Sequence, residues 1–274
     1  MIVIVSDVHL GSDVGRKCRG TGCACDDLDL DPLFQTFIGH IGKEYLHNKE
    51  DRLIFLGDIF DFWRRDAAAV LIDNQEIISK MKDISKRSVI NYVVGNHDYS
   101  IRKMWRGNSK NSLFSTMDKT LNLEINGESF TFIHGHQLEI LANPFNKSEK
   151  IYNSISDALC DSAGATGSTA SAIWSAIDPS KQLDYMKSLK KATSERLQGK
   201  HNARDTVEKL AQSKSRSIYT GADGWLVYGH THRGYVDERS KTANSGSWGR
   251  EDDDSLLDYM LIEDGIPKLC AYEI

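Results

Sequence analysis

The sequence lacks any apolar run close to the roughly 18–20 residues that a helix needs to span a bilayer. Its first apolar stretch, residues 2–5, is too short for the hydrophobic region of a signal peptide, and no basic segment precedes it. Cysteine is scarce as well, because the 274 residues include only five. An odd, low count argues against a disulfide framework and for a reducing compartment. These absences predict a cytoplasmic protein without a transmembrane segment.

A net positive charge is also absent. Lys and Arg number 34 and Asp and Glu number 39, so the formal charge is −5 at pH 7 and the pI is about 6.0. That balance excludes a general nucleic-acid-binding cation. Hydrophobic residues make up 40% of the chain and 21 glycines add to the apolar share, which excludes a wholly disordered chain. With no internal repeat, the length fits one large domain that carries an insertion.

Three of the cysteines, Cys18, Cys23 and Cys25, cluster in a Gly-rich stretch. Their spacing lacks the two-residue gap typical of zinc knuckles, and no second ligand pair follows them. A small zinc or redox site is an alternative there, but the spacing favours reduced thiols in a loop.

What the chain does contain is a recurring short apolar run that ends in a polar loop. The runs are continuous rather than alternating, which is typical of strands covered on both faces. They lie at residues 2–5, 53–56, 89–94, 130–133 and 225–228. Apolar residues spaced near 3.6 predict helices between them, for example over 31–46 and 70–84. This alternation predicts an α/β fold with a mostly parallel central sheet.

Polar clusters follow all five runs, at the strand ends where ligands bind in such sheets. They contain six of the nine histidines (His9, His97, His134, His136, His230 and His232) together with Asp7, Asp58, Asp61, Asn96 and Asp98. Burying so many charges without counter-ions would cost several kcal/mol apiece, so metal ions are the natural neutralisers. Imidazole and oxygen donors without thiolate suit Mn, Fe, Zn, Co or Ni. The set is about right for two ions that share a carboxylate.

Residues 139–221 do not continue this alternation of short apolar runs and polar clusters. Helical spacing recurs there, as in Leu183, Met186 and Leu189. We expect a helical cap at 139–221, inserted into a core domain that is formed by 1–138 and 222–274. A long insertion costs little closure entropy, and one beside a site often shapes substrate access.

The polar clusters also form five recognisable motifs. They are Asp7-x-His9, Gly57-Asp58-x2-Asp61, Gly95-Asn96-His97-Asp98, His134-Gly-His136 and Gly229-His230-x-His232. In this order and over this span, they resemble the calcineurin-like dinuclear metallophosphoesterases. The resemblance implies a four-layer α/β sandwich, with two central mixed β-sheets flanked by helices. It also implies a phosphohydrolase with two divalent ions, Mn²⁺ favoured, that activate a hydroxide for attack on phosphorus.

The same resemblance implies a role for each motif residue. The implied metal ligands are Asp7, His9 and His232 for the first ion, Asn96, His134 and His230 for the second, and Asp58 as the bridge. His97 would face the phosphoryl group and protonate the leaving oxygen, with its orientation set by Asp61. His136 would line the site or donate to a phosphate oxygen, and Asp98 would be a structural hydrogen-bonding residue.

Two further segments, Gly57–Trp63 and Asn244–Trp248, resemble the UDP-2,3-diacylglucosamine diphosphatase branch of that family. The branch also carries a helical cap in the corresponding gap. It commonly has arginine at the position of His97, whereas this chain has the histidine of the wider superfamily. The departure leaves the phosphoesterase chemistry intact and weakens the case for a lipid A precursor as substrate.

Basic residues near the motifs bear on the substrate. Arg64, Arg102 and Arg106 are candidate phosphate-binding side chains, although ordinary surface charge explains them almost as well. Residues 181–216 hold ten Lys or Arg and four Asp or Glu, a local charge of +6. A basic cap could attract a polyanionic substrate or an anionic membrane surface, although a solvated helix face is the simpler interpretation.

We therefore expect hydrolysis of a phosphoester or diphosphate bond in a phosphorylated small molecule or lipid-linked nucleotide, with peripheral contact at the inner face of the membrane. The first alternative is a phosphodiesterase or nuclease that acts on nucleic acid or cyclic nucleotides. The acidic charge and the absence of a repeated aromatic–basic pattern disfavour nucleic acid as its substrate. The second alternative, a non-catalytic metal-binding scaffold, predicts missing ligands, and every expected ligand is present.

Overall fold

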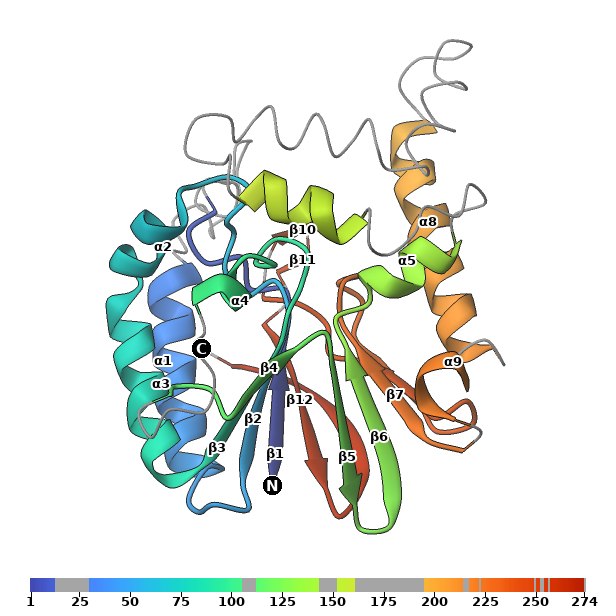
Figure 1. The fold of residues 1–274 in the computed structure, drawn as a ribbon. Helices are drawn as coiled ribbons and strands as arrows, with labels where there is room; N and C mark the ends of the chain where they lie inside the picture. The colour runs from blue at the N-terminus through green and yellow to red at the C-terminus, as the bar shows by residue number, and fades with distance from the viewer. Residues whose placement is uncertain are drawn as a thin grey trace.

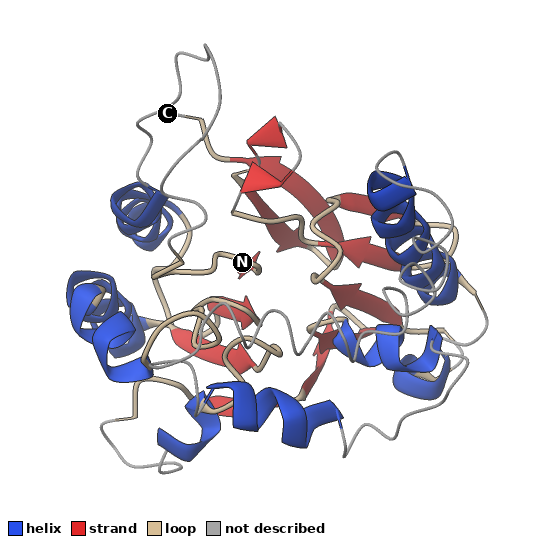
Figure 2. Ribbon diagram, turned by 90° about the horizontal axis from the view of Figure 1, so that it is seen from above, coloured by secondary structure: helices blue, strands red, loops and turns tan. Residues whose placement is uncertain are grey.

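Two β-sheets packed face to face, with helices on their outer sides, make up the fold in a computed structural model of the chain (Figure 1). The structure describes residues 1–12, 30–104, 112–142, 152–160, 195–213, 217–221, 223–248, 250–251, 254–255 and 257–273. Seen from the side on which the first strand ends, helices lie on both outer sides of the pair of sheets (Figure 2).

The first sheet has six strands in the order β13-β12-β1-β2-β3-β4. They are β1 (Ile2–Val5), β2 (Arg52–Leu56), β3 (Val89–Val93), β4 (Thr116–Asp118), β12 (Asp258–Glu263) and β13 (Ile266–Ala271). Strands β1 to β4 run parallel, whereas β12 pairs antiparallel with both β1 and β13. Helices α1 (Leu30–Glu44) and α3 (Gln75–Arg87) bury their apolar faces in the core cluster that covers the outer side of this sheet.

The second sheet has five strands in the order β5-β6-β7-β9-β8. They are β5 (Thr120–Ile125), β6 (Glu128–Ile133), β7 (Trp225–Tyr228), β8 (Tyr235–Asp237) and β9 (Thr242–Asn244). The central three are parallel and the two edge strands are antiparallel. Helices α5 (His136–Ala142), α8 (Glu195–Gln212) and α9 (Ser217–Thr220) lie on the outer side of this second sheet. Strands β10 (Arg250–Glu251) and β11 (Asp254–Ser255) pair with each other in a separate two-stranded sheet.

Residues on alternate sides of each strand divide between separate cores. In β1, Val3 and Val5 belong to the cluster with α1 and α3, whereas Ile2 and Ile4 belong to the cluster between the sheets. The cluster between the sheets also contains Ile54, Leu56, Val93, Phe130, Phe132, Trp225 and Val227. Each such side chain contributes about 1.5–3 kcal/mol through burial. Coverage on both faces explains the continuous apolar runs and confirms the predicted sandwich.

All five strands expected from the apolar runs are confirmed, as is the helix expected over 31–46. The single parallel sheet suggested by periodicity is wrong in detail, because the strands divide between two mixed sheets with antiparallel edges. The single helix expected over 70–84 is also wrong in detail, because the chain there forms two helices, α2 (Ala67–Asp73) and α3. They separate at Asn74, where the buried side-chain amide donates to the carbonyl of Val70 at 2.9 Å and ends the first helix.

Several predictions concern segments outside the described residues. The cluster of Cys18, Cys23 and Cys25 lies there, as do Arg106 and part of the basic stretch 181–216. The division into a core and a cap stays a prediction; α8, which belongs to the 139–221 segment, packs against the second sheet. Within the described ranges, no helix combines the length and apolar character needed to cross a membrane.

Candidate metal centre

The loops that follow β1, β2, β3, β6 and β7 meet at one edge of the two sheets. Parallel pairing brings the ends of neighbouring strands to the same edge. Backbone hydrogen bonds then join the first two loops, from the Asp7 amide to the Gly57 carbonyl and from the His9 amide to the Asp58 carbonyl, each at 3.0 Å. The loop after β7 joins them because the His230 amide donates to Asp7 Oδ2 at 2.8 Å. The polar clusters predicted to converge do so.

Five of the seven predicted ligands have a left-handed backbone conformation. Their φ angles are 53° at Asp7, 52° at His9, 54° at Asp58, 68° at His230 and 60° at His232. For a residue with a Cβ atom this conformation costs roughly 1–2 kcal/mol. Such strain persists only where the surrounding structure enforces it, and it gathers at functional sites. The loops therefore hold these residues in a strained backbone conformation that orients their side chains.

Two motif glycines allow the loops to approach one another closely. A Cβ atom at Gly95 would lie 2.0 Å from Asp58 Oδ1, although the backbone of Gly95 is not left-handed. At Gly57, where φ is +85°, a Cβ atom would lie 2.5 Å from Nδ1 of His134. Neither position can accept a side chain without displacing a predicted ligand.

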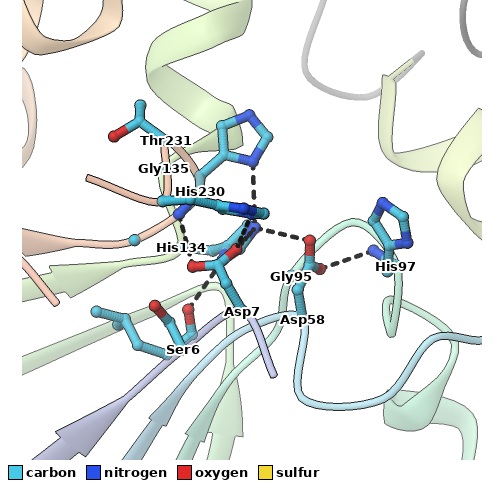
Figure 3. A network of polar contacts seen from close by, with 12 residues as sticks. Ser6, Asp7, Asp58, Gly95, His97, His134, Gly135, His230 and Thr231 are labelled. Atoms are coloured by element: carbon cyan, nitrogen blue, oxygen red, sulfur yellow. Dashed lines mark hydrogen bonds and ion pairs between the residues drawn. The ribbon is translucent and has the colours of Figure 1, made fainter. Parts of the chain in front are cut away.

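One group of side chains gathers around His134. Its Nε2 lies 3.2 Å from Asp58 Oδ2 and 3.3 Å from Nδ1 of His230. Figure 3 shows these three side chains pointing toward one another beside Asp7. Asn96 is buried as well, and its Oδ1 accepts no hydrogen bond within the described part of the chain. The ligand atoms of Asp58, His134 and His230 all lie within 4.8 Å of each other, close enough to share one cation.

A second group joins the other end of the same cluster. The ligand atoms of Asp7, His9 and His232 also lie within 4.8 Å of one another. Nε2 of His232 is 3.2 Å from Asp7 Oδ1, and the buried Nδ1 of His9 has no hydrogen-bond partner among the described residues. The structure thus brings together Asp7, His9 and His232 in one group and Asp58, His134 and His230 in the other, six of the seven predicted ligands.

The two buried carboxylates are held in the charged form by histidines. Burial alone would raise the pKa of Asp7, but the imidazoles of His232 and His134 outweigh it and hold that pKa well below the usual range. Burial likewise opposes ionisation of Asp58, and His134 and His97 lower its pKa strongly. These two buried carboxylates are therefore stabilised in their ionised form by neighbouring positive charge.

The histidines show the complementary shifts. Burial disfavours protonation of His134, but the carboxylates of Asp58 and Asp7 raise its pKa to about 10. Burial and the neighbouring His97 lower the pKa of His9 to about 3, so its imidazole is neutral. Carboxylate oxygens, imidazoles and an amide oxygen that has no hydrogen-bond partner among the described residues fit two divalent cations of the borderline class. The residues present thus match a dinuclear site.

His97 lies beside this cluster and is held from three sides. Its Nδ1 is 3.0 Å from Asp61 Oδ1, and its backbone amide donates to Asp58 Oδ1 at 2.8 Å. The ring stacks on Trp63, with 3.9 Å between ring centroids and an interplanar angle of 21°. Asp61 is fully buried, and His97 outweighs the effect of burial to lower its pKa. The expected Asp61–His97 pair is present, and Trp63 adds a support that the sequence did not reveal.

Two of the three arginines predicted to bind phosphate, Arg64 and Arg102, have other partners. Nη1 of Arg64 forms an ion pair with Asp61 Oδ2, so the positive charge of this arginine balances the negative charge of the carboxylate that orients His97. On α4 (Ile101–Met104), Arg102 donates to the hydroxyl of Tyr99 at 3.0 Å and lies over its ring. Contact of either side chain with a phosphate stays a prediction that requires these pairs to rearrange.

His136 lies behind the predicted ligands. Its ring is fully buried and stacks on Tyr152, with centroids 5.3 Å apart and an interplanar angle of 11°. The centroids of His134 and His230 are 5.5 and 6.4 Å away. Burial and these two imidazoles hold the pKa of His136 well below its usual range. A neutral, buried ring in this place supports the ligands rather than facing solvent.

Asp98 has the structural role expected of it. Its carboxylate accepts hydrogen bonds from the amides of Ile59 and Gly95, each at 2.8 Å, and from the hydroxyl of Tyr92. Burial and the nearby charge of Asp58 raise its pKa to about 6. Asp98 thereby ties the loop after β2 to the loop after β3.

Two further segments contribute contacts to the site that were not predicted from the sequence. Within 244–248, Nδ2 of Asn244 donates to the Gly229 carbonyl at 2.8 Å, and the Trp248 amide donates to the Asp7 carbonyl at 3.2 Å. This segment supports the ligand loops; the sequence analysis singled it out by resemblance but predicted no contact with those loops. The other contribution is Glu139, whose Oε2 lies 2.9 Å from Nε2 of His230, and nothing in the sequence pointed to it.

Comparison with known proteins identifies the family. A sequence model of the calcineurin-like phosphoesterases matches residues 1–234. The chain belongs to this family. Membership confirms the resemblance drawn from the motifs and supports metal-dependent phosphoester hydrolysis at a dinuclear centre.

Individual relatives are more distant. A UDP-2,3-diacylglucosamine hydrolase of Psychromonas ingrahamii is 25% identical over 114 residues, which cover 40% of this chain and 45% of that protein. The match therefore spans less than half of the relative's length. Among solved structures, the E. coli phosphoesterase Yfce is 13% identical with a TM-score of 0.43, covering 98% of this chain and 92% of its own. An archaeal phosphodiesterase is 12% identical with a TM-score of 0.44, covering 99% of each chain.

Proposed function

We propose that the protein hydrolyses a phosphoester or diphosphate bond with the help of two divalent cations. The observation that carries this proposal is that two groups of potential ligands lie side by side at the edge where the sheet strands end. One group is Asp7, His9 and His232, the other is Asp58, His134 and His230, and Nε2 of His134 lies 4.0 Å from Asp7 Oδ1 between them. The Asp61–His97 pair lies directly beside them. A chain of the calcineurin-like phosphoesterase family with this arrangement has the groups that the reaction needs.

The proposed ligands are Asp7, His9 and His232 for one cation, Asn96, His134 and His230 for the other, and Asp58 for both. We infer Mn²⁺ as the first choice, with Fe, Zn, Co or Ni compatible with the same donors. When bound, two such ions lower the pKa of a water molecule and clamp the attacking and leaving oxygens of the displacement.

His97 supplies the proton chemistry of the chain itself. Because the carboxylate of Asp61 accepts from Nδ1, the other ring nitrogen, Nε2, is the one that can face the leaving oxygen, and in the imidazolium form of the ring it can donate a proton there. Trp63 holds the plane of the ring, and Arg64 keeps Asp61 charged. General acid catalysis of this kind contributes roughly 10²–10⁴-fold.

For the substrate, we propose a small or lipid-linked nucleotide, of which UDP-2,3-diacylglucosamine is the first candidate. The hydrolase of Psychromonas ingrahamii and the segment Gly57–Trp63 support it, while histidine at position 97 separates this chain from the arginine common in that branch. Residues 139–221 would cover the substrate and, through their basic stretch, could place the protein against the inner face of the membrane in the cytoplasm.

A substrate panel with the Mn²⁺-loaded protein tests the proposal. We expect turnover of UDP-2,3-diacylglucosamine or a CDP-linked lipid, weaker turnover of bis-p-nitrophenyl phosphate, and none of single-stranded DNA. Asp58→Ala, which removes the shared carboxylate, should be inactive on all of them. Turnover of single-stranded DNA that falls steeply with salt would instead favour a nuclease. Activity that is unchanged in Asp58→Ala would refute the dinuclear site.

A further inference from the structure

Glu139 on α5 lies behind one of the proposed ligands. Its Oε2 is 2.9 Å from Nε2 of His230 and 3.5 Å from the hydroxyl of Tyr152. The Glu139 side chain is 21% exposed and that of His230 is 17% exposed, so their contact is largely shielded from solvent. Glu139 is thus placed to act on the imidazole from the side opposite to the candidate metal centre.

The chemistry of the contact determines which nitrogen of His230 carries the proton. An ionised carboxylate only accepts hydrogen bonds, so Nε2 of His230 must be the donor. In the neutral ring, Nδ1 then keeps its lone pair. That atom lies 3.3 Å from Nε2 of His134, inside the cluster formed with Asp58. The hydrogen bond to Glu139 therefore leaves Nδ1 of His230 unprotonated and directed toward the candidate metal centre.

His134 is arranged in the same way with the two nitrogens exchanged. Its Nδ1 lies 2.9 Å from the carbonyl oxygen of Leu56, which can only accept. Nε2 of His134 therefore faces Asp58 Oδ2, at 3.2 Å. Two neighbouring histidines thus present different nitrogens to one point, and each is fixed by an acceptor behind it.

The two acceptors differ in origin. The Leu56 carbonyl belongs to the backbone of β2 and is part of the sheet. Glu139 is a side chain on a helix, and Tyr152, which touches it, also stacks on the buried ring of His136. The orientation of His230 is therefore linked to the helix over residues 152–160, which lies beyond the sheets on the side of the ligand loops in Figure 1.

We propose that Glu139 is a positioning residue that selects the Nε2-protonated form of His230 and thereby sets the affinity of the second cation. The inference rests on the proposed function, because it takes His230 as a ligand. A carboxylate hydrogen-bonded to a metal-binding imidazole fixes the ring and makes it a stronger donor, and loss of such a partner costs about 10–100-fold in metal affinity.

Three variants of the full chain test this role. Glu139→Ala removes the acceptor, Glu139→Gln keeps an oxygen that can accept from Nε2 but removes the charge, and Leu141→Ala changes an exposed side chain of the same helix as a control. Mn²⁺ binding to metal-free protein is measured by calorimetry. The form of the His230 ring is read from nitrogen NMR of histidine-labelled, metal-free protein at a pH where the imidazole is neutral.

We expect Glu139→Ala to bind one of two Mn²⁺ ions about 10–100-fold more weakly. It should also lose the dominance of the Nε2-protonated form. Glu139→Gln should restore that form and most of the affinity, and Leu141→Ala should match the wild type in both measurements. Wild-type Mn²⁺ affinity and an unchanged His230 ring in Glu139→Ala would overturn the proposal.

The proposed metal site fails by a different result. If the wild type does not bind two Mn²⁺ ions, or if His230→Ala binds them as the wild type does, His230 is not a ligand. The NMR measurement needs no metal, so the effect of Glu139 on the ring is decided separately from the metal site.

Discussion

Gly95→Ala should disable the metal centre through a single methyl group. The new Cβ atom would lie 2.0 Å from Asp58 Oδ1, 2.4 Å from the Asp58 amide nitrogen and 2.8 Å from its Cγ. Ordinary contacts of a Cβ atom begin near 3.4 Å, so Asp58 would have to move by more than 1 Å. Asp58 cannot turn away freely, since its carboxylate contacts His134 and accepts from the amide of His97.

The cost in stability follows from overpacking, which typically destabilises by about 1–3 kcal/mol. For a chain of this size, that corresponds to a fall in Tm of roughly 2–12 °C. The larger effect should be on metal binding, because Asp58 is the carboxylate proposed for both cations. We expect Gly95→Ala to lose at least one Mn²⁺ ion in calorimetric titrations and most of its turnover.

Gly127→Ala is the matched control. Gly127 has a φ of +81° in the turn between β5 and β6, and no atom lies within 4 Å of the position of its Cβ. Its substitution should cost roughly 1–2 kcal/mol through backbone strain alone. Similar losses of stability with different losses of Mn²⁺ affinity would identify the contact with Asp58 as the cause. Two Mn²⁺ ions bound with wild-type affinity by Gly95→Ala would refute the reasoning.

Three further predictions concern catalysis, metal and pH. His97→Ala should keep its Mn²⁺ but lose roughly 10²–10⁴-fold in kcat, and an unchanged kcat would rule out its role as proton donor. Removing metal with a chelator should lower Tm, and Mn²⁺ at about 100 times its Kd should restore about 2.7 kcal/mol of unfolding free energy for each ion bound; a metal-independent Tm would contradict binding to the folded state. Burial raises the pKa of Asp258 to about 6 from 3.8, so its ionisation is disfavoured in the folded state. The stability it contributes is complete below pH 3.8 and is lost as pH rises toward 6, so Asp258→Asn should be more stabilising at pH 8 than at pH 5 in urea unfolding. An equal effect at both values would show that Asp258 does not titrate as described.

The strained backbone of the ligands bears on why the site needs so many supports. Each of the five left-handed ligand residues adds conformational cost, and the neighbouring loops must compensate for it. The compensation is visible in the amide of His230, which donates to Asp7, and in Asp98, which accepts from two loops. The strained conformations thus lower the stability of the fold while they orient the ligand side chains, as is common at functional sites.

Local pattern was enough to predict the strands and the identity of the clustered side chains. The run over 53–56 is apolar at every position because one face of β2 meets the helices and the other meets the second sheet. Asp58 follows that run directly, so its place at a strand end was readable from order alone. The four-layer arrangement came from the resemblance of the motifs rather than from periodicity, which suggested a single sheet.

Features that depend on which way a single side chain turns could not be predicted from residue pattern, even where the partner is close in the sequence. Arg64 was expected to bind phosphate, but it pairs with Asp61, and a sequence does not show where a flexible side chain ends. Asn74 interrupts a periodic helix by donating to the carbonyl of Val70, four positions earlier, a local contact that apolar spacing does not reveal.

By itself, the sequence determined which residues could bind metal and which chain segments would carry them, because residue type and strand periodicity are local properties. Only the tertiary structure decided how those residues are oriented. The His230 amide reaches Asp7 across 223 positions of the chain, and Glu139 reaches His230 across 91. Contacts over such separations depend on how the two sheets pack, so the proton position on His230 is a property of the fold.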